Sequence, residues 1–138
     1  MKVIVCLDNT LGLCLNGRRL SQDRAIIRDI CKDIAESGER LFISRHSVPV
    51  FRGNGARAVV LPDPLAAASE CDGTCFIEFD PLDRYFEKID RVTVYRWNRV
   101  YPSDLKIAFD PALEFPNVTV TEFPGDSHDI ITKEVRYK

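Results

Sequence analysis

The chain has 138 residues, of which 45% are hydrophobic, and its 19 Lys and Arg against 21 Asp and Glu leave a net charge of −2. This composition is too apolar and too weakly charged for a disordered chain, and its acidic balance argues against a polybasic nucleic-acid coat protein. A chain of this length can bury a core of its own, so we expect one soluble domain over residues 1–138.

The first seven residues form a short apolar run that meets Asp8 at once. A signal peptide needs a basic start, a longer apolar stretch and a cleavage site of small residues, and a membrane span needs roughly 20 apolar residues. We therefore expect a cytoplasmic protein that makes no membrane contact.

The five cysteines form an odd set, and without a secretory signal we expect free thiols. Cys71 and Cys75 lie four residues apart, whereas zinc sites favour a two-residue spacing or histidine partners. The two histidines, His46 and His128, form no pair with them in the sequence. We expect no metal site.

Predicted strands and helices alternate in the first half of the chain. Residues 2–7 are almost all apolar, as in a strand buried on both faces, and 8–20 form an irregular segment with an Asn16-Gly17 turn signal. Ser21 is the expected N-cap of a helix that Gly38 ends. After it we expect strands at 40–44 and 58–61, a brief helix within 45–51 and a helical turn at 65–70.

Strands dominate the second half. A strand at 75–79 precedes a helix predicted at 81–88, where Pro81 suits the first turn. Further strands are predicted at 91–98, 105–109, 117–123 and 131–137. This order favours an α/β fold with a mixed, mainly parallel central sheet flanked by helices and completed by an antiparallel C-terminal hairpin.

In this order of elements the sequence resembles dihydrofolate reductase over nearly its whole length, although the identity is weak. The apolar first strand, the loop with Gly12 and Asn16-Gly17, and Asp23 in the first helical turn follow one another as in that family. The run ISRHS at 43–47 stands where the family has Gly-Arg-x-Thr/Ser. The run TEFPGD at 121–126 resembles the family's closing hairpin.

The resemblance implies NADPH-dependent reduction of folate. It makes Asp23 the counterpart of the catalytic acid that binds the pterin, and it makes Arg45 and Ser47 candidates for binding the cofactor phosphates. The residues themselves also allow simpler roles. A first-turn carboxylate stabilises a helix, and Arg45 suits a surface position beside a helix cap.

The sequence departs from the family in the half that should bind the cofactor. The family has Gly-Gly after its fifth strand, where the backbone approaches a pyrophosphate, whereas Ile77 is followed here by Glu78-Phe79-Asp80-Pro81. Arg18-Arg19-Leu20 replaces a Pro-Trp pair, and 52–75 is too short for the family's full strand, helix and strand. We expect NADPH to be disfavoured, and a small planar or phosphorylated ligand to bind near Asp23.

Two alternatives stay open. In the first, a divergent NADPH-dependent reductase uses Asp23 and the Arg45-His46-Ser47 turn in a rearranged cofactor site. In the second, the stretch 95–101 binds nucleic acid or a protein partner, because it interleaves arginines with Tyr95 and Trp97. The acidic chain disfavours nucleic acid, and the same rings, if exposed, would suit a homodimer surface.

A last candidate is the loop that holds Asp126, His128 and Asp129. A histidine between carboxylates can act as a general base. No Gly-x-Ser-x-Gly motif accompanies it, and polar loops are common, so a solvated turn explains these residues equally well.

Overall fold

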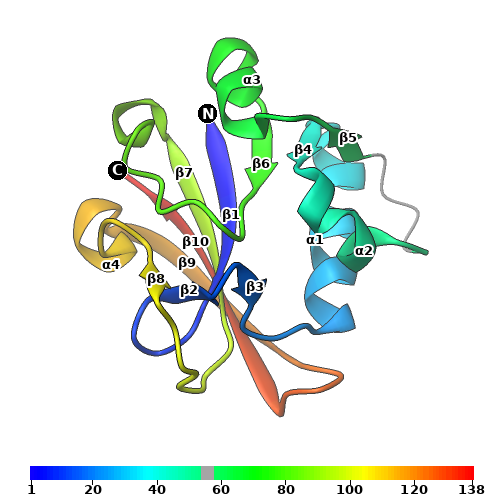
Figure 1. The fold of residues 1–138 in the computed structure, drawn as a ribbon, viewed down its shortest axis with the longest axis vertical. Coiled ribbons are helices and arrows are strands. Elements are labelled where there is room, and N and C mark those ends of the chain that lie inside the picture. The colour runs from blue at the N-terminus through cyan, green and yellow to red at the C-terminus, as the bar shows by residue number, and fades with distance from the viewer. Residues whose placement is uncertain (54–57) are drawn as a thin grey trace.

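The computed structural model describes residues 1–53 and 58–138 (Figure 1). Its strands are β1 (Lys2–Leu7), β2 (Gly12–Leu15), β3 (Arg18–Arg19), β4 (Leu41–Ile43), β5 (Ala58–Val60), β6 (Thr74–Phe76), β7 (Arg91–Arg96), β8 (Leu105–Lys106), β9 (Asn117–Pro124) and β10 (Ile130–Tyr137). Its helices are α1 (Arg24–Ser37), α2 (Val48–Phe51), α3 (Pro64–Cys71) and α4 (Pro111–Glu114), with 3₁₀ turns at Arg45–Ser47 and Phe86–Lys88.

A seven-stranded sheet in the order β5-β4-β6-β1-β7-β10-β9 forms the centre of the molecule. The pairs β4–β5, β4–β6, β1–β6 and β1–β7 are parallel, and β10 runs antiparallel to both β7 and β9. Strands β3, β2 and β8 form a small second sheet. The mixed, mainly parallel sheet and the closing hairpin that the sequence predicts are therefore confirmed.

The sheet is covered on both faces. On one face, α1 packs its isoleucines against the central strands in a cluster that includes Ile26, Ile30, Phe76 and Tyr95. On the other face, α3 and the later loops contribute a second cluster around Val3, Leu65, Val94 and Phe115. Parallel strands buried on both faces explain why residues 2–7 are almost continuously apolar.

Two predictions about helices are wrong. The N-cap of α1 is Asp23 rather than Ser21, because the Asp23 carboxylate accepts the Ala25 backbone N–H. The helix predicted at 81–88 is absent apart from its last 3₁₀ turn. The Asp80 carboxylate accepts the Leu82 N–H, and Leu82 takes a left-handed φ of 69°, so a local turn replaces the helix start.

The segment 52–75 is less reduced than the sequence suggests. It contains β5, α3 and the start of β6, although both strands are only three residues long. Residues 54–57 of this segment lie outside the described part of the chain. Strand β6 ends at Phe76, so Ile77, Glu78 and Phe79, which were predicted to continue it, form a loop.

Candidate functional site

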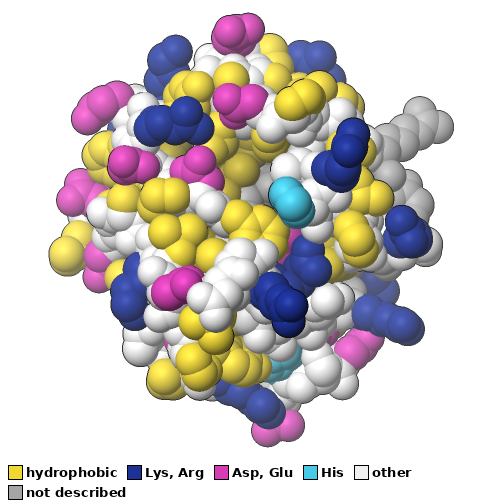
Figure 2. All heavy atoms as spheres, viewed as in Figure 1, with side chains coloured by type: hydrophobic (Ala, Val, Ile, Leu, Met, Phe, Trp, Pro, Cys, Tyr) yellow, Lys and Arg dark blue, Asp and Glu magenta, His cyan; other side chains and the backbone are white. Residues whose placement is uncertain are grey.

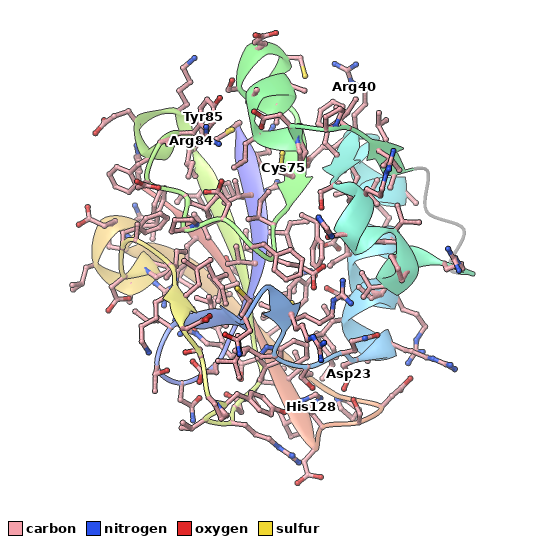
Figure 3. The ribbon with its side chains drawn as sticks, viewed as in Figure 1. Asp23, Arg40, Cys75, Arg84, Tyr85 and His128 are labelled. Carbon is pink, nitrogen blue, oxygen red and sulfur yellow. The ribbon has the colours of Figure 1, made fainter. Side chains whose placement is uncertain are left out.

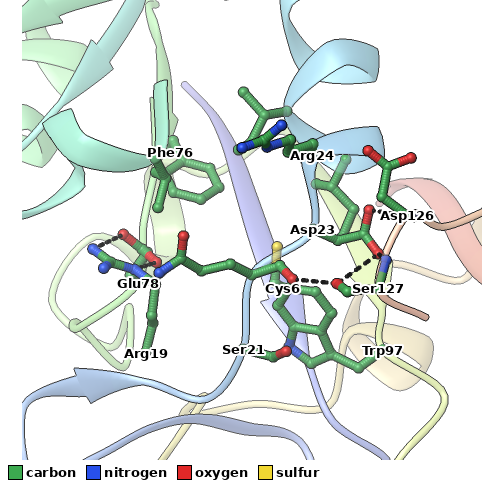
Figure 4. Close-up of a pocket in the computed structure, with 14 residues that line it drawn as sticks. Cys6, Arg19, Ser21, Asp23, Arg24, Phe76, Glu78, Trp97, Asp126 and Ser127 are labelled. Atoms are coloured by element: carbon green, nitrogen blue, oxygen red, sulfur yellow. Dashed lines mark hydrogen bonds and ion pairs between the residues drawn. The ribbon is translucent and has the colours of Figure 1, made fainter. Parts of the chain in front are cut away.

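A cavity of about 370 Å³ opens between α1, the central strands and the β9–β10 loop (Figure 4). Side chains from both halves of the chain line it: Cys6, Arg19, Ser21, Gln22, Asp23, Arg24, Ile26, Ile27, Val50, Phe76, Glu78, Trp97, Asp126 and Ser127. Asp23, near which the sequence predicts a ligand, is one of the lining residues.

The cavity has apolar walls and a polar mouth. Ile26 and Ile27 come from the first turn of α1, Phe76 ends β6 and Trp97 directly follows β7. These four side chains are almost fully buried, so the walls are held in place by the core behind them. Flat or apolar molecules are the ligands that such a surface accepts best.

Asp23 is fully buried, with no side-chain exposure, and every acceptor site of its carboxylate is used. One oxygen accepts the backbone N–H groups of Ala25 and Asp126, each at 2.9 Å. The other accepts from the Ser127 N–H at 3.0 Å and from His128 Nδ1 at 2.9 Å, whereas the Ser127 hydroxyl, 3.2 Å away, gives its one proton to the Gln22 carbonyl at 2.7 Å. The carboxylate thus joins the start of α1 to the β9–β10 loop.

Burial alone would raise the pKa of Asp23, but these donors overcome it. The Asp126 N–H, the His128 ring and the other hydrogen bonds hold the pKa of Asp23 far below its ordinary value. The group is therefore a permanent carboxylate. Because a carboxylate has about four acceptor sites, a pterin could bind Asp23 only by displacing one of the internal donors.

His128 is also buried, with 2% of its side chain exposed, and it lies on Asp23 rather than in solvent (Figure 3). Its ring stacks on Trp97, with centroids 4.8 Å apart and planes inclined by 28°. Nε2 lies 2.9 Å from the Tyr101 hydroxyl and 3.2 Å from the Ser21 hydroxyl. Sequence reasoning placed His128 between Asp126 and Asp129, and so missed both its true partner and Ser21.

The neighbouring acids of the loop do not contact this ring. Asp126 forms a two-pronged ion pair with Arg28 of α1, at 2.8 and 3.0 Å, which holds the pKa of Asp126 below its ordinary value. Asp129 is exposed. Asp23 and His128 are 105 residues apart in the chain. No local sequence pattern could therefore have identified them as partners.

Gly125 is required by the close approach of this loop to Asp23. A Cβ atom at Gly125 would lie 2.5 Å from an Asp23 carboxylate oxygen and 2.6 Å from the His128 carbonyl oxygen. We expect Gly125→Ala to lower the free energy of unfolding by about 1–3 kcal/mol, because the backbone must shift to accept a methyl group. Urea denaturation checks this. Pro124→Ala is the control, because it changes an exposed neighbour and should lower the free energy of unfolding less. Gly17→Ala cannot serve, because Gly17 has a left-handed φ of 70° that alanine would strain.

The opposite side of the cavity is held by an ion pair. Arg19 donates to Glu78 through Nε at 2.8 Å and Nη2 at 3.2 Å, and the Ser47 hydroxyl donates to the same carboxylate at 2.7 Å. Arg19 also donates to the His46 carbonyl at 2.6 Å. These contacts tie β3, the 3₁₀ turn and the loop after β6 together.

The structure separates the two residues expected to hold cofactor phosphates. Ser47 is buried and bonded to Glu78, whereas Arg45 is exposed beside a different depression near Val60. A groove of about 300 Å³ runs between the 3₁₀ turn and the loop after β6, and the carboxylates of Glu78 and Asp80 line it. The phosphate-binding role of Arg45 and Ser47 stays a prediction.

The aromatic side chains of 95–101 do not form an exposed face. Tyr95 and Trp97 are buried, and the Tyr95 hydroxyl donates to Asp29 at 2.6 Å. Arg96 is paired with Glu134 across the strands. The two rings on which base stacking or a homodimer surface would depend are therefore part of the core under α1.

Two further observations concern the rest of the described chain. Within residues 1–53 and 58–138, no three His, Cys, Asp or Glu side chains are placed to hold a metal ion, and Cys75 is buried with its thiol donating to the Pro64 carbonyl. None of the helices in the same ranges has the length and apolar character that a bilayer crossing requires.

Comparison of the sequence with protein-family models and with curated proteins gave no match. Comparison of the structure did. The fold matches dihydrofolate reductase from Enterococcus faecalis, solved in complex with NADP(H) and RAB-propyl, with a TM-score of 0.61. The match covers 99% of this chain and 94% of that enzyme at 10% sequence identity. The chain therefore has a dihydrofolate-reductase-like α/β fold.

Proposed function

We propose that this protein binds a small, flat, partly apolar molecule that carries an anionic group, in the cavity beside Asp23. The observation that carries the proposal is the cavity itself, with Ile26, Ile27, Phe76 and Trp97 as apolar walls. A volume of about 370 Å³ is in the range of small-molecule sites.

The anionic group is inferred from Arg24, because every other charged side chain of the lining already has a partner: Arg19 pairs with Glu78, Asp126 pairs with Arg28, and internal donors fill the Asp23 carboxylate. Arg24 is exposed at the first position of α1 and lines the cavity, and no ion pair to it occurs within residues 1–53 and 58–138. The helix start adds partial positive charge at the same place. In Figure 2 several Lys and Arg side chains lie near the centre of the face and on the side of α1 and α2.

We do not propose conventional NADPH-dependent folate reduction. Asp23 has its acceptor sites filled by internal donors, so it lacks a free oxygen for a pterin. Glu78 and Asp80 line the groove beside the 3₁₀ turn Arg45–Ser47, and their ion pairs with Arg19 and Arg84 occupy the cations that a cofactor phosphate would need. Both features support ligand binding without the usual cofactor.

Binding can be followed through Trp97, the only tryptophan of the chain. We expect anilinonaphthalene sulfonate and pterin carboxylate, two flat anions, to quench its fluorescence at micromolar concentrations. Val50→Phe should weaken both by at least about tenfold, because the larger ring fills part of the cavity. Val100→Phe is the matched control, since Val100 is 67% exposed and lies outside the cavity lining.

Arg24→Gln tests whether the charge of Arg24, and not only the shape of the cavity, contributes to binding. It should weaken the sulfonate dye while leaving its uncharged parent amine unchanged. If the sulfonate dye and pterin carboxylate bind Val50→Phe as tightly as wild type, the proposal is contradicted. If the sulfonate dye binds Arg24→Gln as tightly as wild type, the ligand need not carry an anionic group.

A divergent NADPH-dependent reductase is the second candidate, and the fold match to an enzyme solved with NADP(H) favours it. Mixing the protein with NADPH and dihydrofolate tests it directly. We expect no consumption of NADPH above the buffer rate. Turnover that is lost in Asp23→Asn would make this second candidate the function.

A further inference from the structure

Two side chains that line the cavity, Ser21 and Asp23, are joined through His128 behind them into a continuous hydrogen-bonded row. The Ser21 hydroxyl lies 3.2 Å from His128 Nε2, and His128 Nδ1 lies 2.9 Å from the Asp23 carboxylate. Ser21 and Asp23 line the cavity and lie close to Trp97 in Figure 4. His128 itself is behind them, buried under Trp97 and Tyr101.

The proton positions in this row follow from Asp23. Its depressed pKa keeps it ionised, so it can only accept, and His128 Nδ1 must carry the proton that it donates. In the neutral ring Nε2 then presents a lone pair toward the hydroxyls of Ser21 and Tyr101. This is the tautomer that a general base needs in order to take a proton from a serine.

We propose that Ser21 is a nucleophile activated by His128, that Asp23 is the residue that positions His128, and that the cavity hydrolyses small esters. This inference rests on the proposed function, because it uses the same ligand cavity. It adds that the bound molecule is hydrolysed there. The three roles depend on geometry and not on the order of the residues in the chain.

The reaction balances without any redox partner. Ser21 Oγ attacks the ester carbonyl carbon while its proton moves to His128 Nε2, and the C–O bond to the alcohol then breaks as that proton passes to the leaving oxygen. Water next attacks the acyl carbon, with His128 again taking the proton. The acid leaves, and Ser21 recovers its proton. Gln22 and Arg24 line the cavity and offer N–H donors for the developing oxyanion.

The surroundings hold His128 in this role. Stacking on Trp97 restricts rotation of the ring, and Ser127 lies 3.2 Å from Nδ1, on the Asp23 side. The Ser127 hydroxyl is already used, since it donates to the Gln22 carbonyl at 2.7 Å. Ser21 is therefore the serine on the base side of the ring. Tyr101, at 2.9 Å, competes with it for the same lone pair.

The test uses a fluorophosphonate probe, which labels activated serines, followed by peptide mapping on the wild-type protein. We expect the label on Ser21 and hydrolysis of an aryl acetate. Ser21→Ala and His128→Asn should each lower hydrolysis by about 100-fold or more. Tyr101→Phe should retain or raise it, because the lone pair is then left to Ser21. Ser69→Ala is the matched control, since its hydroxyl bonds only within α3.

Asp23→Asn tests the positioning role. Its rate relative to wild type should recover as pH rises, since hydroxide can replace the misplaced base, whereas mere unfolding would give no recovery. Label on any serine other than Ser21, or unchanged hydrolysis in Ser21→Ala, overturns the inference. Ser21→Ala should still bind the sulfonate dye, so a failure of hydrolysis alone leaves the proposed binding function standing.

Discussion

Replacing Asp23 with alanine should lower the free energy of unfolding by about 3–5 kcal/mol, because the change leaves buried hydrogen-bond donors without an acceptor. Three backbone N–H groups and His128 Nδ1 lose their acceptor, whereas the Ser127 hydroxyl keeps the Gln22 carbonyl. The loss also removes the N-cap of α1. Urea denaturation near neutral pH, followed by circular dichroism, measures the difference.

The pH dependence of that difference identifies its cause. Folding depresses the pKa of Asp23, so its contribution to stability is present above its unfolded pKa, about 4, and is lost as pH falls below that value. The gap between wild type and Asp23→Ala should therefore shrink steadily in acid. Taking the difference between the two proteins cancels the other depressed carboxyl groups, such as Asp8 and Glu134.

Asp126→Ala is the matched control for this experiment. Asp126 lies in the same loop, and its backbone N–H, which the change retains, is one of the donors to Asp23. Its side chain is 44% exposed and is paired with Arg28 at the surface. The loss of stability should be far smaller than in Asp23→Ala. Equal losses in the two variants would mean that the buried carboxylate does not organise the site.

The sequence was most informative where burial alone determines structure. Residues 2–7 are almost all apolar, as in a strand buried on both faces, so β1 could be predicted, whereas its place between β6 and β7 is known from the structure. The two predicted strands at 117–123 and 131–137 likewise indicate a hairpin, although β9 is exposed along almost its whole length. In both cases the pattern is local, and the tertiary structure adds nothing that contradicts it.

The site was harder to predict because its contacts are distant or depend on one side chain. Asp23 could be placed at the start of α1, but its partner His128 is 105 residues away. Tyr95 and Trp97 could be placed on one face of a strand, but only the position of α1 shows that this face is buried. The helix predicted at 81–88 is replaced at its start by a turn in which the Leu82 N–H donates to the Asp80 carboxylate.

Glu78 provides the second large expected effect, since its carboxylate accepts from both Arg19 and Ser47. The double change of Glu78 and Phe79 to glycine should raise NADPH affinity by at least about tenfold, or roughly 1.4 kcal/mol. It removes one negative charge from the groove, frees the Arg19 guanidinium and the Ser47 hydroxyl for a phosphate, and lets the backbone approach the ligand. Isothermal titration calorimetry with NADPH measures the change.

Two single variants divide this effect between charge and bulk. Glu78→Gln keeps the volume but removes the charge, so a gain in affinity there reports electrostatic repulsion. Phe79→Gly keeps the Glu78 carboxylate and only opens the loop, so it should bind NADPH little better than wild type does. If wild type binds NADPH as tightly as the double variant, Glu78 is no barrier to the cofactor. The groove between the 3₁₀ turn Arg45–Ser47 and the loop after β6 would then have to be reassigned as a nucleotide site, with Glu78 neutralised by Arg19 and Asp80 by Arg84.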